Sequence, residues 1–197
     1  MNNFIFENKT KVYFGRGGVR EYLGCLLKKY GDMVMLAYGG GSIKKNGVYD
    51  EVKGILTDAG KTVVEFGGIM PNPTYAKVKE GARIAKESGI DLILAVGGGS
   101  VSDCCKIISA QAKTADDIWD MQYTKHTYPT EFIPLGTIVT VFGTGSEMNA
   151  GAVITNEDKK IKGALFGAQA DFAFLDPTYT LSVPMKQVVS GAFDTLS

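Results

Sequence analysis

Apolar and polar residues alternate along the chain with two different periods. Six mostly apolar residues at 33–38 predict a buried strand, and Val48, Val52, Ile55 and Leu56 then recur at steps of three and four, as on one face of a helix. The succession continues with strands at 62–66, 91–97 and 132–141 and with helices at 74–88 and 100–112. This order predicts an α/β fold whose open, mostly parallel sheet carries helices on both faces.

The beginning of the chain predicts a further strand. Residues 11–14 are mostly apolar and follow a second apolar segment at 3–6, so the two indicate an N-terminal β-hairpin or an edge strand. An edge strand has unpaired backbone groups, and we expect a homodimer formed through it.

The composition narrows the class of protein. The 197 residues are 45% hydrophobic and 21% charged, with 25 Gly and 6 Pro, which is typical of one globular core or of one domain with part of another. A net charge of +0 gives no electrostatic reason to expect nucleic acid or an anionic membrane as a partner. The N-terminus lacks the features of a signal peptide, and the adjacent Cys104 and Cys105 with Cys25 read as reduced thiols. We therefore expect a cytoplasmic protein.

A glycine-rich tetrapeptide, GGGS, follows two of the predicted strands. It occupies residues 39–42 and 97–100, and a helix is predicted after each copy. Such a turn exposes backbone N–H groups to which a phosphate can bind, although a single copy is more often only a tight turn. Two copies at strand ends favour phosphate binding. The usual G-x-G-x-x-G dinucleotide motif is not among the glycine-rich segments.

Two further segments carry polar side chains that core packing does not require. Ser100 and Asp103 form an S-x-x-D pattern, which fits a helix cap, a carboxylate facing the nucleotide cleft, or both, and Lys106 is spaced to pair with Asp103. A loop at 140–151 follows a strand, and its polar side chains are suited to a sugar or phosphate: Thr140, Thr144, Ser146 and Asn149. The single histidine, His126, lies in a polar segment and reads as a surface residue, so neither a catalytic triad nor a multi-His metal site is predicted.

Several motifs together resemble one family. The segments AVGGGSVSDCCK, PLGTIVTVFGTGSEMNAGAVI, PNPT, LDP and GAFDTLS resemble, in the same order, the iron-containing (group III) alcohol dehydrogenases, and AYGGGSIKKNG is similar to their NADPH-dependent butanol dehydrogenase and aldehyde reductase branch. The resemblance implies a Rossmann-like nucleotide-binding domain followed by an all-helical domain, in which one Asp and three His hold a divalent metal. It implies hydride transfer between an alcohol or aldehyde and the nicotinamide.

The resemblance also implies which residues hold the cofactor. Those residues are Gly39, Gly40, Gly41, Ser42, Asn72, Gly97, Gly98, Gly99, Ser100, Asp103, Thr140, Thr144, Ser146, Asn149, Lys160 and Tyr179. The first turn would hold the adenosine side, the second the pyrophosphate, Lys160 the nicotinamide ribose and Tyr179 the adenine or its ribose. Because the first turn contains no carboxylate and is followed by Lys44 and Lys45, we expect NADP(H) rather than NAD(H).

Asp194 stands on an otherwise apolar segment, and the resemblance gives it a role. It matches the first metal ligand of a G-x-x-D-x-x-x-H pattern, whose His would follow at position 198. We therefore expect a nucleotide-binding domain at 1–183 and, at 184–197, the first residues of a truncated helical metal-binding domain. A catalytic Fe, Zn or similar metal would need the remaining ligands. A chain without them is expected to be inactive.

Two other functions fit part of this sequence. A dehydroquinate synthase-like lyase or a glycerol-phosphate dehydrogenase shares the GGGS…D…K core, and a nucleotide-binding module without catalysis needs only the turns. The TGSE segment and the surroundings of Asp194 favour the alcohol dehydrogenase alternative.

Overall fold

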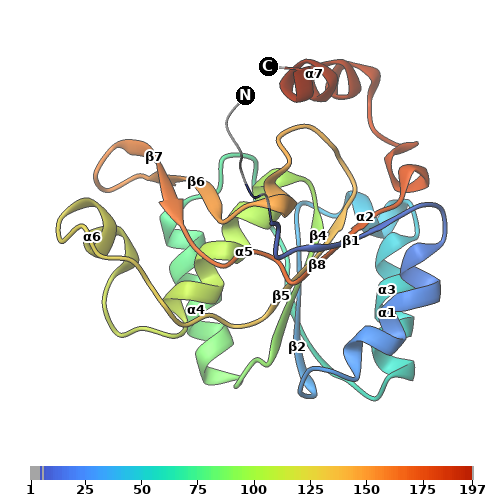
Figure 1. Ribbon diagram of the computed structural model, residues 1–197, viewed down its shortest axis with the longest axis horizontal. Coiled ribbons are helices and arrows are strands. Elements are labelled where there is room, and N and C mark those ends of the chain that lie inside the picture. The colour runs from blue at the N-terminus through green and yellow to red at the C-terminus, as the bar shows by residue number, and fades with distance from the viewer. Residues whose placement is uncertain (1–4, 6, 197) are drawn as a thin grey trace.

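A six-stranded parallel sheet forms the centre of the computed structural model, which describes residue 5 and residues 7–196 (Figure 1). Its strands are β1 (Lys11–Phe14), β2 (Met33–Tyr38), β3 (Thr62–Phe66), β4 (Leu92–Gly97), β5 (Leu135–Val139) and β8 (Phe172–Leu175). They lie in the order β1-β8-β5-β4-β2-β3, and each neighbouring pair is parallel. The predicted open parallel α/β sheet is confirmed.

Helices cover both faces of the sheet, as expected. On one face lie α1 (Gly18–Leu27), the short α2 (Ser42–Lys45) and α3 (Val48–Asp58); on the other lie α4 (Tyr75–Glu87) and α5 (Gly99–Gln111) (Figure 1). The short helix α6 (Ile118–Tyr123) lies beyond α4 and α5. The predicted helices at 74–88 and 100–112 therefore match α4 and α5 closely.

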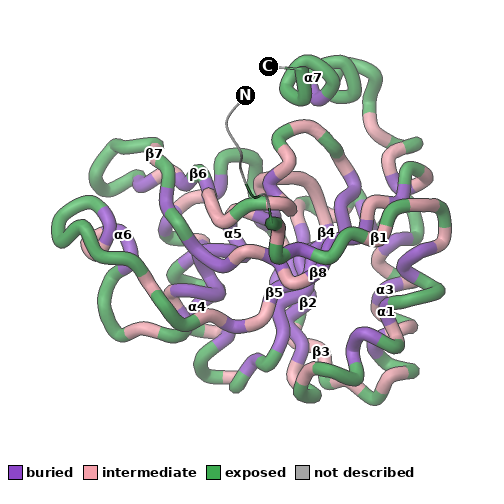
Figure 2. The backbone as a smooth tube through the Cα atoms, in the orientation of Figure 1, coloured by how far each residue is buried: buried purple, intermediate pink, exposed green. Residues whose placement is uncertain are grey.

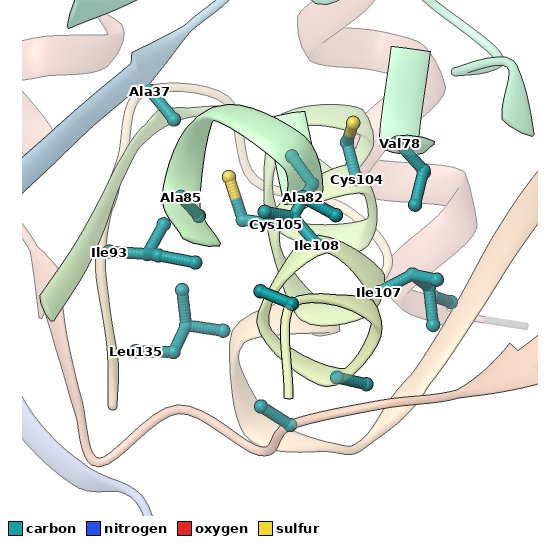
Figure 3. Close-up of a cluster of buried hydrophobic side chains, with 14 of the residues drawn as sticks. Ala37, Val78, Ala82, Ala85, Ile93, Cys104, Cys105, Ile107, Ile108 and Leu135 are labelled. Atoms are coloured by element: carbon teal, nitrogen blue, oxygen red, sulfur yellow. The ribbon is translucent and has the colours of Figure 1, made fainter. Parts of the chain in front are cut away.

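Each face of the sheet has its own hydrophobic core, and Figure 2 shows the buried strands between them. The core on the α5 side includes Ile93, Leu135 and Ile108, and Figure 3 shows Cys104 and Cys105 among these side chains. All three cysteines are free, and burial raises the pKa of the Cys104 thiol to about 12. The buried pair therefore acts as small apolar side chains of the core.

A two-stranded antiparallel hairpin stands apart from the main sheet. It consists of β6 (Gly151–Asn156) and β7 (Ile161–Phe166), and it packs on α5 and α4. The last helix, α7 (Met185–Leu196), lies beyond the carboxyl ends of the strands and rests on the loop after β5 (Figure 1). Its contact is close because Gly191 has no side chain: a Cβ there would collide with the carbonyl oxygen of Phe142.

The N-terminal strand is an edge strand of the parallel sheet. Lys11 pairs with Phe172 and Phe14 with Leu175, so β1 adds to β8 in parallel. This confirms the edge-strand alternative. The other strand of the predicted hairpin, at 3–6, lies outside the described residues except for Ile5, which is not in a strand.

Candidate nucleotide-binding site

The order of the strands creates a crevice between β2 and β4. From β2 the chain continues outward to β3 over one face, whereas from β4 it continues in the opposite direction to β5 over the other face. Such a switch point leaves an opening at the carboxyl ends of the two strands, which is where ligands of open α/β sheets bind. The two GGGS turns follow these two strands directly.

The second turn leads into a long helix whose N-terminus has no side-chain cap. Helix α5 begins at Gly99 after the N-cap Gly98, which makes no side-chain cap hydrogen bond, and its first turn contains no acidic residue. Gly99 and Ser100 line a pocket. An uncapped helix N-terminus that faces a pocket is suited to a phosphate, because its N–H groups and the helix dipole both favour an anion.

This pocket has a volume of about 400 Å³ and lies between α5, the loop after β5, the β6–β7 hairpin and α7. Four glycines are among the residues that line it: Gly99, Gly143, Gly145 and Gly191. A Cβ on Gly99 would lie 2.9 Å from Oγ1 of Thr144. The glycine therefore keeps open the cradle that a bound group would occupy.

Below the pocket, the buried Lys106 joins three segments of the chain. Its ammonium group donates hydrogen bonds to Ser146 Oγ (2.8 Å), Asn149 Oδ1 (3.1 Å) and the carbonyl oxygen of Gly151 (2.7 Å), and it lies 3.6 Å from Asp103 Oδ1. Burial is the main cause that lowers the pKa of Lys106 to about 8, and the Asp103 charge opposes this shift. Lys106 thus fixes the loop after β5 to α5.

Asp103 completes this connection and also lines the pocket. Its Oδ1 accepts a hydrogen bond of 2.5 Å from Ser146, its Oδ2 accepts one of 2.9 Å from the amide of Val153, and its side chain is 16% exposed. The predicted pairing of Asp103 with Lys106 is confirmed by the 3.6 Å distance. Both carboxylate oxygens accept hydrogen bonds from within the protein, so Asp103 has a structural role. The expected contact of Asp103 with the cofactor stays a prediction.

One lysine that the sequence interpretation did not single out lies in the pocket. Lys162, on β7, donates a hydrogen bond of 2.7 Å to Asn72 Oδ1, and both residues line the pocket. Asn72 has a φ of 54°, and the adjacent Pro73 accepts a hydrogen bond from Thr155 of β6. The hairpin therefore brings Lys162 to Asn72. Lys160, the predicted residue, lies at the exposed turn before β7 and does not line the pocket.

The remaining predicted residues do not all line this pocket. Thr144 lines the pocket, whereas Ser146 and Asn149 are directed to Lys106, and Thr140 is buried where β5 ends. Tyr179 lies away from this pocket, beside Glu51 and Asp176, and burial raises the pKa of its hydroxyl. The predicted adenine contact of Tyr179 stays a prediction.

The first turn lies at the other side of the crevice. Gly41 adopts a φ of 103°, and a Cβ on Gly39 would lie 3.8 Å from Val101 Cγ2, so the turn adjoins the start of α5. Gly40 faces open space, and Ser42 begins α2. Of the four residues, none lines the 400 Å³ pocket, so the two turns serve different parts of the crevice.

Asp194 lies at the opposite wall of the pocket from α5. It projects from α7 toward the loop after β5, and a Cβ on Gly143 would lie 3.6 Å from its Oδ2. Within residue 5 and residues 7–196, no three His, Cys, Asp or Glu side chains converge to hold a metal ion. The described residues therefore do not by themselves make a metal centre, and Asp194 is a single candidate ligand.

Comparison with known proteins identifies the family. The family model for iron-containing alcohol dehydrogenase matches residues 9–177. The chain belongs to the iron-containing alcohol dehydrogenase family. Full-length enzymes of this family are oxidoreductases that use a nicotinamide cofactor and a divalent metal.

Individual relatives differ in the cofactor that their names state. The chain is 48% identical over its whole length to the probable NADH-dependent butanol dehydrogenase 1 of Bacillus subtilis, of which it covers 51%. Over 98% of its length it is 41% identical to the NADPH-dependent aldehyde reductase YqhD of Escherichia coli, of which it covers 50%. The chain spans about half the length of the curated relatives it matches.

Solved structures agree with the fold. The crystal structure of NADH-dependent butanol dehydrogenase A from Thermotoga maritima matches with a TM-score of 0.91 and 40% identity, over 98% of this chain and 49% of that one. A sulfoacetaldehyde reductase from Bifidobacterium kashiwanohense, solved in complex with NAD⁺, matches with a TM-score of 0.86 and 26% identity, over 100% and 52%. Among the described residues of this chain, no helix is long and apolar enough to cross a membrane.

Proposed function

We propose that this chain is the nucleotide-binding half of a metal-dependent NADP(H) alcohol dehydrogenase or aldehyde reductase acting on a primary alcohol or aldehyde. The observation that carries the proposal is the placement of two GGGS turns at the β2/β4 switch point, the second of which contributes Gly99 and Ser100 to a pocket of about 400 Å³. When bound, the nicotinamide supplies a carbon that donates or accepts hydride.

The residues of the chain bind and orient the cofactor in this proposal. The α5 N-terminus at Gly99 and Ser100 binds the diphosphate, and the ammonium group of Lys162, fixed by Asn72, adds a positive charge on the same pocket. Asp103 and Lys106 hold the loop after β5 in position. Val141 and Phe142 line this pocket and also a second pocket between the loop after β5 and α7.

NADP(H) is the proposed cofactor because of the charges around the first turn. The turn itself contains no carboxylate, and Lys44 and Lys45 follow it directly, so a 2′-phosphate meets attraction instead of repulsion. The relatives include both NADH-dependent and NADPH-dependent enzymes by name, so their names favour neither cofactor.

Asp194 is proposed as one metal ligand of the whole protein. A divalent transition metal is usually held by three or four ligands, and the described residues bring no such group together. The 197-residue chain is therefore proposed to bind the cofactor without turning over alcohol. Metal-dependent oxidation of butanol by this chain, purified free of longer proteins, would contradict this part of the proposal.

The proposed partners are a small alcohol or aldehyde and a second copy of the chain, with no nucleic acid or membrane. The edge strand β1 offers the surface for the second copy, since Val12 and Phe14 are exposed there. Analytical ultracentrifugation of the wild type and of Phe14→Lys tests it: a dimer that becomes a monomer in the variant is expected.

The nucleotide site is tested by titrating NADPH fluorescence with the wild type and with two matched glycine variants. In Gly99→Ala the new methyl group enters the cradle beside Thr144, and we expect NADPH binding to weaken roughly tenfold. In Gly54→Ala the methyl group on α3 meets no atom within 4 Å, so binding stays unchanged.

The outcomes separate the proposal from its alternatives. Saturable binding that weakens only in Gly99→Ala supports it. Wild-type protein that binds neither NADPH nor NADH, with a folded circular dichroism spectrum, excludes a nicotinamide site, and equal weakening in both variants places the nucleotide elsewhere.

A further inference from the structure

We infer that Lys44 is the residue that selects a 2′-phosphorylated dinucleotide, and that Glu65 with two tyrosines holds it in position for this task. The inference rests on the proposed nicotinamide function and identifies which charge near the first turn matters. The juxtaposition that carries it is a group of five side chains, called the Lys44 cage: Tyr38, Lys44, Tyr49, Lys53 and Glu65.

Lys44 lies over the faces of two aromatic rings. Its Nζ is 4.9 Å from the ring centroid of Tyr38 and 4.5 Å from that of Tyr49, and it is 3.7 Å from Glu65 Oε2. The tyrosine rings meet edge to face, with centroids 5.7 Å apart. Ring faces attract an ammonium group, so Lys44 is held at the turn although its side chain is 46% exposed.

Glu65 occupies the place where many dinucleotide sites have a carboxylate that binds the ribose. It stands near the end of β3, 24 positions after Gly41, and an acidic residue at about this spacing commonly accepts a hydrogen bond from the adenosine 2′-hydroxyl of NAD. By position alone, Glu65 would therefore favour NAD(H).

The hydrogen bonds of Glu65 argue against that role. Its Oε1 accepts hydrogen bonds from Tyr49 (2.5 Å) and from Lys53 (2.6 Å), and its Oε2 accepts one from Tyr38 (2.9 Å). These contacts, Lys53 first, lower the pKa of Glu65 to about 2, so the carboxylate stays ionised and occupied. Two lysines and one glutamate leave the cage with one positive charge. Both lysines are partly exposed, but Lys53 is hydrogen-bonded to Glu65 at 2.6 Å whereas Lys44 lies 3.7 Å from it, so Lys44 is the cation less engaged by the carboxylate.

The cage also fixes the geometry of the turn. Tyr38 is the residue before Gly39, and Lys44 belongs to α2, which begins at Ser42. The cage therefore includes residues from both sides of the first turn. Gly67 allows the Tyr38 ring to lie close, because a Cβ there would be 2.7 Å from Tyr38 Cε2. A ligand at the exposed Gly40 therefore meets Lys44 in a fixed position.

Lys45 provides the matched control. It is the next residue, carries the same charge and is exposed, but it makes none of the cage contacts. If only the net charge near the turn selects the cofactor, Lys44→Gln and Lys45→Gln have equal effects. If the cage selects it, they differ.

The experiment measures Kd values of NADPH, NADH, 2′,5′-ADP and 5′-ADP for the wild type, Lys44→Gln, Lys44→Arg and Lys45→Gln. For Lys44→Gln we expect binding of NADPH and 2′,5′-ADP to weaken roughly tenfold and NADH to stay within twofold, as for the loss of one charge-assisted contact. Lys44→Arg restores most of the NADPH affinity, and Lys45→Gln weakens NADPH binding by at most about threefold, because the charge of Lys45 acts on the 2′-phosphate without a fixed position. Raising the salt concentration reduces the difference between the wild type and Lys44→Gln.

Two further variants test the supporting residues. Glu65→Gln and Tyr49→Phe weaken the cage while Lys44 remains, so NADPH binding should fall severalfold with NADH unchanged. Loss of NADH binding in Glu65→Gln would show that the carboxylate contacts the ribose, which overturns the assignment. Thermal unfolding of each variant identifies those that fail to fold.

The results also distinguish this inference from the proposed function. A wild type that binds NADH but not NADPH leaves the nicotinamide site in place and overturns the selection by Lys44. Equal effects of Lys44→Gln and Lys45→Gln overturn it as well, whereas a wild type that binds neither cofactor overturns both.

Discussion

The two GGGS turns have the same sequence, but different groups of side chains hold them in place. The second turn, at Gly97–Ser100, precedes a 13-residue helix and is backed by the buried Lys106 and its oxygen ligands. The first, at Gly39–Ser42, precedes a helix of four residues and is backed by the partly exposed Lys44 cage. Substitutions in a buried hydrogen-bond network cost much of the free energy of unfolding. An exposed charged network changes its strength with salt, pH and single substitutions, and these changes cost little stability. We therefore propose that the same tetrapeptide forms a fixed phosphate site in one place and an adjustable selection site in the other.

Removing Lys106 is expected to have the largest effect of any change near the turns. In Lys106→Met the Asp103 carboxylate loses its cation and three oxygen atoms lose a donor, so the free energy of unfolding should fall by about 3 kcal/mol or more. Urea unfolding followed by circular dichroism measures this. The control is Lys113→Met just after α5, where the side chain is exposed and the change should be within about 0.5 kcal/mol.

A loss no larger than that of the control would contradict the description of the second turn. It would mean that Ser146, Asn149 and Gly151 find other partners without the ammonium group. The comparison between the two turns would then lose its physical basis.

The sequence predicted the sheet well because parallel strands buried on both faces are almost continuously apolar. The strands expected at 33–38 and 62–66 agree with β2 and β3 to the residue. It missed the β6–β7 hairpin, whose short strands are partly exposed and are joined by a turn of charged residues at 157–160. Without the hairpin there was no basis for singling out Lys162, the lysine that lines the pocket.

Side-chain partners far apart in the sequence were harder to predict. Ser146 and Asn149 were expected to face the ligand, but a buried ammonium group 40 and 43 positions earlier requires them as acceptors. The spacing of Asp103 and Lys106 indicated their pairing, but no local pattern indicated that Lys106 is fully buried. Glu65 was not singled out, because its partners come from β2 and α3.

Adding one methyl group to each turn is expected to change the free energy of unfolding by different amounts, both smaller than the effect of Lys106→Met. In Gly97→Ala the Cβ would lie 2.5 Å from Val101 Cγ2 and 2.9 Å from Val101 Cβ, so rotation of the valine does not relieve the collision. We expect a loss of about 1–3 kcal/mol in the free energy of unfolding. In Gly40→Ala the Cβ meets no atom within 4 Å, and we expect a change within about 0.5 kcal/mol.

Thermal and urea unfolding of the two variants provide the measurement. Equal losses would show that the turns are packed alike and that the contrast between them is wrong. A large loss in Gly40→Ala alone would indicate that the first turn is the more constrained.

The smallest expected effect is a pH dependence specific to the first turn. The pKa of Glu65 is lowered to about 2 in the folded protein from an ordinary value of 4.5, first through its hydrogen bond from Lys53. Between pH 4.5 and pH 2 the unfolded chain therefore binds more protons at this position than the folded one, so the stabilisation from Glu65 is present above pH 4.5 and is lost as the pH falls toward 2. Because the side chain is 32% exposed, solvent screening limits this contribution to less than about 1 kcal/mol.

Glu65→Gln removes this contribution, and the difference in unfolding free energy between the wild type and the variant measures it. We expect the wild type to be more stable at pH 6, the difference to shrink as the pH falls below 4.5, and most of it to be lost at about pH 2. Glu87→Gln is the control, since Glu87 is an exposed glutamate of α4 paired with Arg83 and lies outside the Lys44 cage. A difference for Glu65→Gln that stays constant with pH would mean that the carboxylate is not held by Tyr38, Tyr49 and Lys53 in solution. The cage would then be too loose to fix Lys44, and the first turn would have no support to compare with that of the second.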